Sequence, residues 1–227
     1  MVNQKNINEL YSMHQVLLEF YGPLHWWPGE SSLEIMVGAI LTQNTNWQNV
    51  SKAIAKLKEE GLLAVTALFQ IKEEALAGRI KSCGYYNLKA RRLKNFINFF
   101  YCNYEGSVEK LFSIDWKILR EELLKINGIG PETADSILLY AGNKPVFVVD
   151  AYTRRIFQRH NYFSFQASYQ EIQHFFMAHL PQDHSLYNEF HAQLVMLGKN
   201  YCKKNTPHCL QCPLSPFLNG KIIPPKH

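Results

Sequence analysis

Residues 125–135 read Lys-Ile-Asn-Gly-Ile-Gly-Pro-Glu-Thr-Ala-Asp, and a short apolar run ends at Asp150, one helix further on. Gly128 and Gly130 allow a tight chain reversal, because glycine adopts backbone angles that other residues avoid. Pro131 suits the first turn of a following helix. The stretch therefore predicts two helices joined by a glycine turn, whose exposed amides lie at a helix N-terminus and attract an anion such as a phosphate. The apolar stripes of the two helices are Trp116, Leu119, Leu123 and Ile126 before the turn, and Ala134, Ile137, Leu138 and Ala141 after it.

The composition is that of a globular protein. The chain has 227 residues, of which 47% are hydrophobic and 19% charged, enough for one large domain or two small ones. A net charge of +5 is compatible with nucleic acid but is also common among other proteins. The polar N-terminus does not resemble a signal peptide, and no apolar run is long enough to span a membrane. Five cysteines without a secretory signal indicate a reducing cytoplasm.

Helical periodicity dominates the chain and predicts an all-α fold. Residues 33–41 are apolar nearly all round, which is typical of a helix buried on every side. Only residues 146–149 look strand-like, and they are too few to form a sheet. The expected helices cover residues 6–20, 33–44, 47–59, 72–82, 88–102, 115–126, 131–142, 151–160, 168–180 and 185–201.

Four motifs, in the same order, resemble the helix-hairpin-helix DNA glycosylases of the endonuclease III superfamily. They are residues 41–45, 84–90, 128–150 and 198–212, so that the resemblance spans about residues 26–212. It implies a two-domain fold with an interdomain cleft. Residues 28–144 would form a helical barrel that contains the hairpin, and residues 1–27 and 145–227 the second domain. The expected partner is double-stranded DNA with a damaged base, bound by a monomer.

Asp150 is the expected catalytic residue. Cleavage of an N-glycosidic bond builds positive charge on the sugar, which a nearby carboxylate stabilises while it orients a water. Aspartate is also a favoured N-cap, and the helix that begins at Ala151 could require no more than that. The two roles are compatible, and the family resemblance favours catalysis.

Glu132 predicts a monofunctional enzyme. Bifunctional members of the family carry a lysine two residues after the second glycine of the hairpin, and its amine attacks the sugar to form a Schiff base. This chain has Glu132 there, and neither Lys125 nor Lys144 matches the position. A carboxylate forms no imine, so we expect an abasic site as the product. The simpler interpretation of Glu132 is an acidic residue that favours the helix dipole.

Aromatic residues suggest the substrate. Trp26, Trp27 and Trp47 resemble the corresponding segments of bacterial 3-methyladenine DNA glycosylases of the endonuclease III type. Bases alkylated at ring nitrogens are often cationic, and a cation over an indole face gains about 0.5–2 kcal/mol. Endonuclease III itself has an acidic residue at the position of Trp47, which argues against oxidised pyrimidines. Tryptophans are otherwise most often core or interface residues.

Gln43 and Tyr85 match family positions that fill the space left by an extruded nucleotide. Alternatively, Gln43 caps a helix end and Tyr85 is an ordinary loop aromatic. The basic run after Tyr85 is consistent with phosphate contact, although a solvated helix face is the default for such a run. The residues of this run are Lys89, Arg91, Arg92 and Lys94.

The cysteines Cys202, Cys209 and Cys212 resemble the iron–sulfur loop of the superfamily. That loop ends with a fourth cysteine at the position of Leu218, and a [4Fe–4S] cluster normally takes four thiolates. Cys83 and Cys102 fall in the other expected domain. Three interpretations stay open: a cluster whose fourth ligand is a water or a histidine, a zinc ion bound with the help of His208, or a remnant without metal.

Two rival functions also stay open. One is an endonuclease III-like glycosylase and lyase that acts on other lesions. The other is a non-catalytic DNA-binding protein that retains the hairpin and has lost the chemistry.

Overall fold

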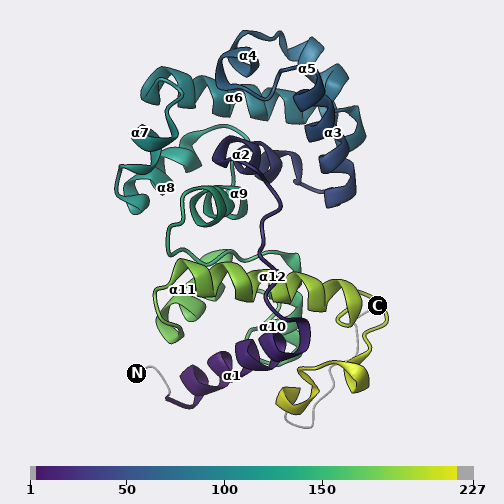
Figure 1. Cartoon of the computed structure of the whole chain (residues 1–227). Coiled ribbons are helices and arrows are strands. Elements are labelled where there is room, and N and C mark those ends of the chain that lie inside the picture. Colours follow the sequence, from purple (N-terminus) through teal and green to yellow (C-terminus); the bar gives the residue numbers. More distant parts are fainter. Residues whose placement is uncertain (1–3, 219–227) are drawn as a thin grey trace. The chain divides into compact units, whose positions relative to one another are not determined.

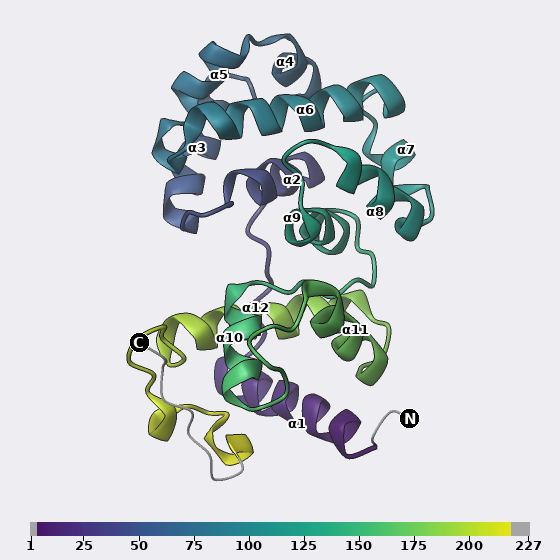
Figure 2. The same cartoon turned by 180° about the vertical axis from the view of Figure 1, so that it is seen from behind.

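The computed structural model describes residues 4–218, and these contain twelve α-helices and no β-strand (Figures 1 and 2). The predicted all-α fold is confirmed. The chain divides into two compact units, Trp27–Lys144 and a second unit formed by the segments on either side of it. Trp27, which the sequence analysis placed with the N-terminal segment, belongs to the first of these units. No helix in the described part of the chain is long and apolar enough to cross a membrane.

The unit Trp27–Lys144 is built around one buried helix, α2 (Ser32–Leu41). This helix packs against α3, α6, α9 and the turn that follows α9, which explains why its sequence is apolar nearly all round (Figure 1). Its one buried carboxylate, Glu34, is 6% exposed and lies 2.9 Å from the Nζ atom of Lys58. The other helices of this unit are α3 (Trp47–Glu59), α4 (Val65–Gln70), α5 (Glu73–Arg79), α6 (Tyr86–Tyr104), α7 (Val108–Phe112), α8 (Trp116–Lys125) and α9 (Pro131–Ser136).

The stretch from α8 to α9 forms the predicted helix, glycine turn and helix. Asp115 caps α8, since its side chain accepts hydrogen bonds from the amides of Lys117 and Ile118. Pro131 occupies the first turn of α9, where its missing amide proton costs nothing. The expected single helix 131–142 is in fact α9 followed by a π-helical turn, η2 (Ile137–Ala141), which is a rare conformation that is frequent at functional sites.

The second unit contains α1 (Gln4–Tyr21), α10 (Ala151–Arg159), α11 (Tyr169–His179) and α12 (His184–Asn200). The helix α12 packs against α1 and α10, and α1 also packs against α11 (Figure 2). Ser168 and Glu171 form a reciprocal capping box at the start of α11. Two short turns, η3 (Cys209–Gln211) and η4 (Ser215–Leu218), follow α12 in the cysteine-containing segment.

Two short helices, α4 and α7, were not predicted from the sequence. Each spans six residues or fewer, so hydrophobic periodicity has too few turns in which to show itself. The strand-like residues 146–149 are extended but form no strand. All four of these side chains are buried, which accounts for their apolar character without a sheet.

Candidate functional site

The structure requires glycine at position 128 of the turn but not at position 130. Gly128 has a φ of +96°, and a Cβ atom added there would lie 2.2 Å from Cγ of Arg92. Gly128 is therefore required by both backbone conformation and packing. Gly130 has an ordinary φ of −93°, and a Cβ atom there would meet nothing within 4 Å. The space beside Gly130 is open, so its backbone is accessible to a ligand.

Gln43 is tied to this glycine turn. Its side-chain Nε2 donates hydrogen bonds to the carbonyl oxygen of Gly128 at 3.0 Å and to Oγ1 of Thr133 at 2.9 Å. Its Oε1 accepts a hydrogen bond from Nη1 of Arg92 at 2.5 Å. The side-chain amide of Gln43 thus connects the segment after α2, the turn and α6.

The basic run on α6 is largely structural. Lys89 is 1% exposed and donates to the carbonyl oxygens of Leu41 and Cys83. Lys94 donates to three carbonyl oxygens at the end of α4, and Arg92 holds Gln43. The expectation of a solvated helix face is wrong for Lys89. Its buried amine instead donates hydrogen bonds to backbone carbonyls at the end of α2 and in the turn before α6. Only Arg91 has the exposure expected of a surface cation, and it pairs with Glu73.

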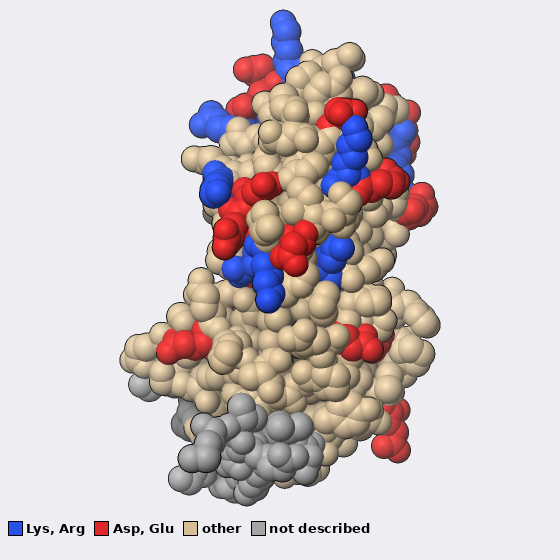
Figure 3. Space-filling view, turned by 90° about the vertical axis from the view of Figure 1, so that its left-hand side faces the viewer, with Lys and Arg blue, Asp and Glu red and all other residues tan. Residues whose placement is uncertain are grey.

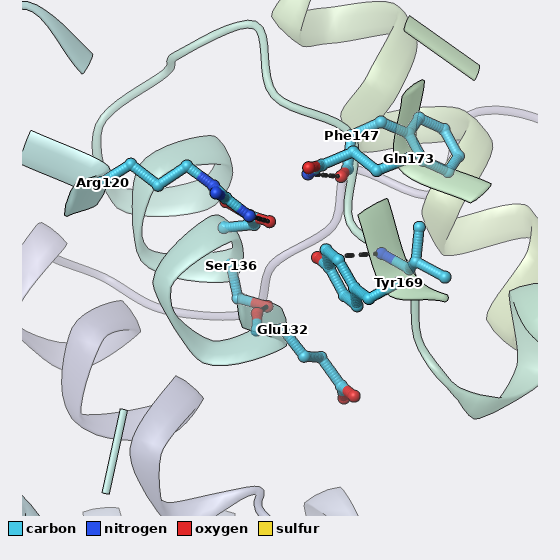
Figure 4. Close-up of polar contacts among 8 residues, drawn as sticks. Arg120, Glu132, Ser136, Phe147, Tyr169 and Gln173 are labelled. Atoms are coloured by element: carbon cyan, nitrogen blue, oxygen red, sulfur yellow. Dashed lines mark hydrogen bonds and ion pairs between the residues drawn. The ribbon is translucent and has the colours of Figure 1, made fainter. Parts of the chain in front are cut away.

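The start of α9 presents Glu132 to solvent (Figure 4). In the same helix, the buried carboxylate of Asp135 forms a bidentate pair with Arg120 of α8, with N···O distances of 2.5 and 2.9 Å. Such a pair fixes both distance and orientation between the two helices. The hairpin is therefore rigid where Glu132 projects.

Aromatic side chains cluster at one end of α2. The rings of Trp27 and Trp47 meet edge to face with centroids 5.3 Å apart, and Tyr140 lies 5.0 Å from Trp27. A Cβ atom on Gly38 would lie 3.3 Å from each of the two indoles, so this glycine makes room for them. The structure brings together two of the three expected pocket residues. It adds Tyr140 of the π-helical turn η2, which the sequence analysis did not identify.

Trp26 lies elsewhere. It belongs to the second compact unit, where the Nζ atom of Lys199 lies 5.6 Å from its ring centroid. A cation already occupies that position over the indole.

Tyr85 is an exposed aromatic residue in a strained conformation. It is 73% exposed and has a φ of +46°, which is unusual for a residue with a side chain. It occupies the N-cap position of α6 without a side-chain cap hydrogen bond. Strain of this kind, which costs about 1–3 kcal/mol, tends to occur at functional positions.

Asp150 caps α10 through one carboxylate oxygen, and its second oxygen takes no part in the cap. Its Oδ1 accepts the amide hydrogen bond of Thr153 at 2.7 Å, as the capping interpretation expects. Its Oδ2 lies 3.8 Å from Nε2 of His191, and the side chain is 13% exposed. Burial lowers the pKa of His191, more than the negative charge of Asp150 raises it. The imidazole is therefore neutral near pH 7 and places no positive charge beside the carboxylate.

The extended segment before Asp150 is fixed by α11 (Figure 4). Gln173 donates to the carbonyl oxygen of Phe147 at 2.7 Å, and the hydroxyl of Tyr169 accepts the amide hydrogen bond of Val149 at 3.3 Å. These contacts satisfy backbone groups that no sheet satisfies. The backbone that precedes Asp150 is therefore held by α11, and the side chain of Asp150 is held by its cap hydrogen bond to α10.

The cysteines Cys202, Cys209 and Cys212 line one cavity in the second unit, together with Leu218. Burial raises the pKa of the Cys212 thiol to about 11. Nη1 of Arg159 donates to Sγ of Cys202 at 3.2 Å. His208, the expected auxiliary zinc ligand, is exposed and is not among the lining residues, whereas His160 is. The sequence analysis missed His160 because it lies more than forty residues before the cysteines.

A shallow basic groove lies beside the start of α10. Its lining includes Tyr152, Arg155, Lys199, Lys203 and Lys204. Such a concentration of positive charge suits a phosphate backbone. On the face shown in Figure 3, by contrast, cations and carboxylates are interspersed over the upper part, which contains Trp27–Lys144. The sequence analysis missed the groove because its cations come from α10, α12 and the segment after α12.

Comparison with known families gives a match to the HhH-GPD superfamily of base excision DNA repair proteins over residues 37–182. Among curated proteins, the chain is 45% identical to MJ1434 of Methanocaldococcus jannaschii, provisionally named a DNA repair glycosylase, over 97% of this chain and 100% of that protein. It is 29% identical to endonuclease III of Thermotoga maritima over 78% of each chain.

Solved structures give the same picture. The 3-methyladenine DNA glycosylase MagIII of H. pylori, bound to 1,N6-ethenoadenine, matches with a TM-score of 0.70 and 30% identity, over 86% of this chain and 96% of that one. A complex of endonuclease III with DNA matches with a TM-score of 0.79 and 22% identity, over 96% and 95% of the two chains, which supports the fold alone.

Proposed function

Because the chain belongs to the HhH-GPD superfamily of base excision DNA repair proteins, we propose that it is a monofunctional DNA glycosylase specific for alkylated purines such as 3-methyladenine. Its assignment as a DNA glycosylase of base excision repair follows from the family. The observation that carries the rest is the fixed carboxylate of Asp150, capped through one oxygen and partly exposed. The product is duplex DNA with an abasic site.

Asp150 acts on the sugar. As the bond between C1′ and the base nitrogen breaks, the base takes the electron pair and the sugar gains oxocarbenium character. The negative charge of Asp150 stabilises that cation, and a water adds to C1′ while its proton passes to the carboxylate. Neutral His191 is important here, because an imidazolium beside Asp150 would cancel the field that stabilises the sugar.

The aromatic cluster supports an alkylated base. A purine methylated at a ring nitrogen is a cation and a good leaving group, so a site with one carboxylate suffices for its release. The indole faces of Trp27 and Trp47 favour such a cation by about 0.5–2 kcal/mol. The similarity to MagIII, solved with 1,N6-ethenoadenine, supports a modified adenine as the substrate.

The lysines support hydrolysis and argue against strand cleavage. Glu132 stands where bifunctional members carry the Schiff-base lysine. The Nζ atom of Lys144 donates to the carbonyl oxygen of Phe112, and the amine of Lys89 is buried. Neither amine is placed as an exposed nucleophile, which supports hydrolysis without strand cleavage.

DNA contact is assigned to the open side of Gly130 and to the basic groove beside α10. The backbone at Gly130 is accessible to a phosphate, and the groove adds lysines that release counterions when DNA binds. Exposed Tyr85, in its strained conformation, is assigned to the space left by the extruded nucleotide. Gln43 is assigned to the same task, in contact with the turn.

The decisive experiment measures base release and covalent trapping together. Methylated calf-thymus DNA and duplexes with a single lesion are incubated with the full chain, and released bases are separated by chromatography. We expect release of 3-methyladenine, and no borohydride-stable adduct with abasic DNA. An adduct in the wild type supports the endonuclease III-like lyase instead. No release from any lesion in a broad panel, with DNA binding intact, supports the non-catalytic protein.

A further inference from the structure

The segment that follows α12, residues 201–218, has little regular structure of its own (yellow in Figure 2). Its only regular elements are the short turns η3 and η4. A segment of this kind opens easily unless contacts with the rest of the chain hold it in place. In the family loop that it resembles, an iron–sulfur cluster has this task.

The side chains of this segment do not fit such a cluster. Leu218 stands where the family loop has its fourth cysteine, and a leucine offers no lone pair. Within residues 4–218, no three or more Cys, His, Asp and Glu side chains are grouped so that they could hold a metal ion. The cavity lined by the three cysteines has about 20 Å³ that the centre of a water molecule can occupy, which is room for about one water. A [4Fe–4S] cluster is several times larger and normally takes four thiolates.

Arg159 of α10 contacts three successive residues of the segment. Its Nη1 atom donates to the carbonyl oxygen of Lys203 at 2.7 Å and to Sγ of Cys202 at 3.2 Å, and its Nη2 atom donates to the carbonyl oxygen of Lys204 at 2.7 Å. The fixed fork of donors in a guanidinium allows one side chain to hold several acceptors. Arg159 is 9% exposed, so water competes little for these hydrogen bonds.

Arg155, one turn earlier on α10, holds the start of the segment. It donates to the carbonyl oxygens of Cys202 and Gly198, at 2.7 and 3.1 Å. Its guanidinium carbon also lies 5.0 Å from the ring centroid of Tyr152. That ring packs closely on Gly198, where a Cβ atom would lie 2.3 Å from Cδ1 of Tyr152. The end of α12 and the start of the segment are therefore both fixed to α10.

These contacts determine where the two lysines of the segment lie. The side chains of Lys203 and Lys204 are exposed and line the basic groove beside α10. The arginines bind the backbone of these residues, so their ammonium groups remain available to a ligand in the groove. Cations held in fixed positions lose less conformational entropy when they bind a phosphate backbone.

We propose that the two arginines of α10 hold this segment in place of a metal cluster and so position its two lysines for contact with the DNA backbone, a proposal that rests on the function above only in taking DNA as the ligand of the groove. Arg159 is a positioning residue, because it is nearly buried and lies outside the lining of the groove. The thiols of Cys209 and Cys212 are then dispensable for DNA binding.

The first test needs no DNA. The full chain is purified without oxygen, and we expect its iron, zinc and acid-labile sulfide to be far below one per chain. Trypsin then cleaves the native protein after Lys203 and Lys204, at a rate that follows the population of the opened segment. Arg159→Lys keeps the charge but loses the fork of donors, and should raise this rate about tenfold. The matched control is Arg154→Lys, because Arg154 of the same helix donates to the carbonyl oxygen of Ala167 in another segment, and it should leave the rate unchanged.

The second test measures the binding of duplex DNA over a range of salt concentrations. In Arg159→Lys the displaced lysines should lose their phosphate contacts, so that the slope of log K against log salt becomes less steep by up to about 1.8 for two contacts. The double variant Lys203→Gln/Lys204→Gln should show the same loss, and adding Arg159→Lys to it should cause no further change. Arg154→Lys and Cys209→Ser should keep the slope of the wild type.

Four results would overturn the proposal: iron or zinc in stoichiometric amount, loss of DNA binding in Cys209→Ser, an unchanged cleavage rate in Arg159→Lys, or an unchanged salt slope when that rate has risen. Circular dichroism checks that Arg159→Lys is folded. If it is not, Arg155→Lys replaces it in the cleavage test, with the same expected increase, since Arg155 holds the same segment. A wild type that releases no base would contradict the proposed function while the metal content and the cleavage rates stayed as expected here.

Discussion

The side-chain amide of Gln43 donates a hydrogen bond of 3.0 Å to the carbonyl oxygen of Gly128, so that the end of α2 is connected directly to the glycine turn. The two residues are 85 positions apart in the sequence. Thr133 and Arg92 complete the same network. The residue assigned to the extrusion of a nucleotide therefore also positions the turn assigned to the phosphate.

Gln43→Ala should destabilise the hairpin. It leaves the partly buried carbonyl of Gly128, the hydroxyl of Thr133 and the guanidinium of Arg92 without this partner, at a cost of about 1–3 kcal/mol. Urea unfolding measures this loss. Gln48→Ala, an exposed glutamine of α3, should change stability by less than about 0.5 kcal/mol. Equal stability of both variants would show that the network contributes nothing.

Alanine substitutions at the two glycines of the turn should have different effects, one on stability and the other on DNA binding. Gly128→Ala places a methyl group against Arg92 at a positive φ and should cost about 2–4 kcal/mol of stability. Gly130→Ala meets no neighbour and should cost less than about 1 kcal/mol. It should nevertheless weaken duplex DNA binding about tenfold, or about 1.4 kcal/mol, because its methyl blocks the approach of a phosphate. Fluorescence anisotropy measures the binding, and unchanged affinity of Gly130→Ala would exclude the turn from the DNA interface.

Asp150→Asn should abolish most base release without unfolding the protein. Asparagine caps a helix as well as aspartate does, but it carries no charge to stabilise the sugar. We expect single-turnover release of 3-methyladenine to fall by about 10²–10⁴-fold with little change in stability. The matched control is Asp183→Asn, which alters the N-cap of α12 in the same unit. Normal release by Asp150→Asn would assign Asp150 to capping alone.

Glu132→Lys should introduce Schiff-base chemistry. The side chain at this position is exposed at the start of α9, where bifunctional relatives carry their lysine. We expect a borohydride-trapped adduct with abasic DNA in this variant and none in the wild type, measured as a shifted band on a denaturing gel. Glu121→Lys, an exposed glutamate of α8, is the control for added charge. An adduct equally strong in Glu121→Lys would show that the position has no special geometry.

Stability should fall as the pH drops below about 6.5. Burial lowers the pKa of His14 and of His191, so the unfolded chain binds protons that the folded chain excludes. Stability from these groups is complete above the unfolded pKa and decreases as the pH falls, by at most about 1.4 kcal/mol per pH unit for each histidine. Urea unfolding between pH 7 and 5 measures the slope. His14→Gln should reduce it, whereas His184→Gln, which changes an exposed histidine, should not.

Local patterns were sufficient to predict much of this protein from its residues. The three-to-four spacing before and after the glycines predicts α8 and α9, because helix periodicity depends only on which face is apolar. The cap at Asp150 follows from residue type alone. Residues 33–41 are apolar nearly all round, which predicts the burial of α2. In each case the physical cause lies within a few residues along the chain.

Contacts between distant segments required the folded structure. Nothing in the sequence places the amide of Gln43 on Gly128, the ring of Tyr140 beside Trp27, or His160 in the cavity that Cys202 lines. These relationships depend on how helices pack, and packing is set by side-chain volumes summed over many positions. Periodicity shows which face of a helix is buried, but it does not specify which helix covers that face. For this reason the residue types indicated the chemistry, while the partners of each side chain emerged from the fold.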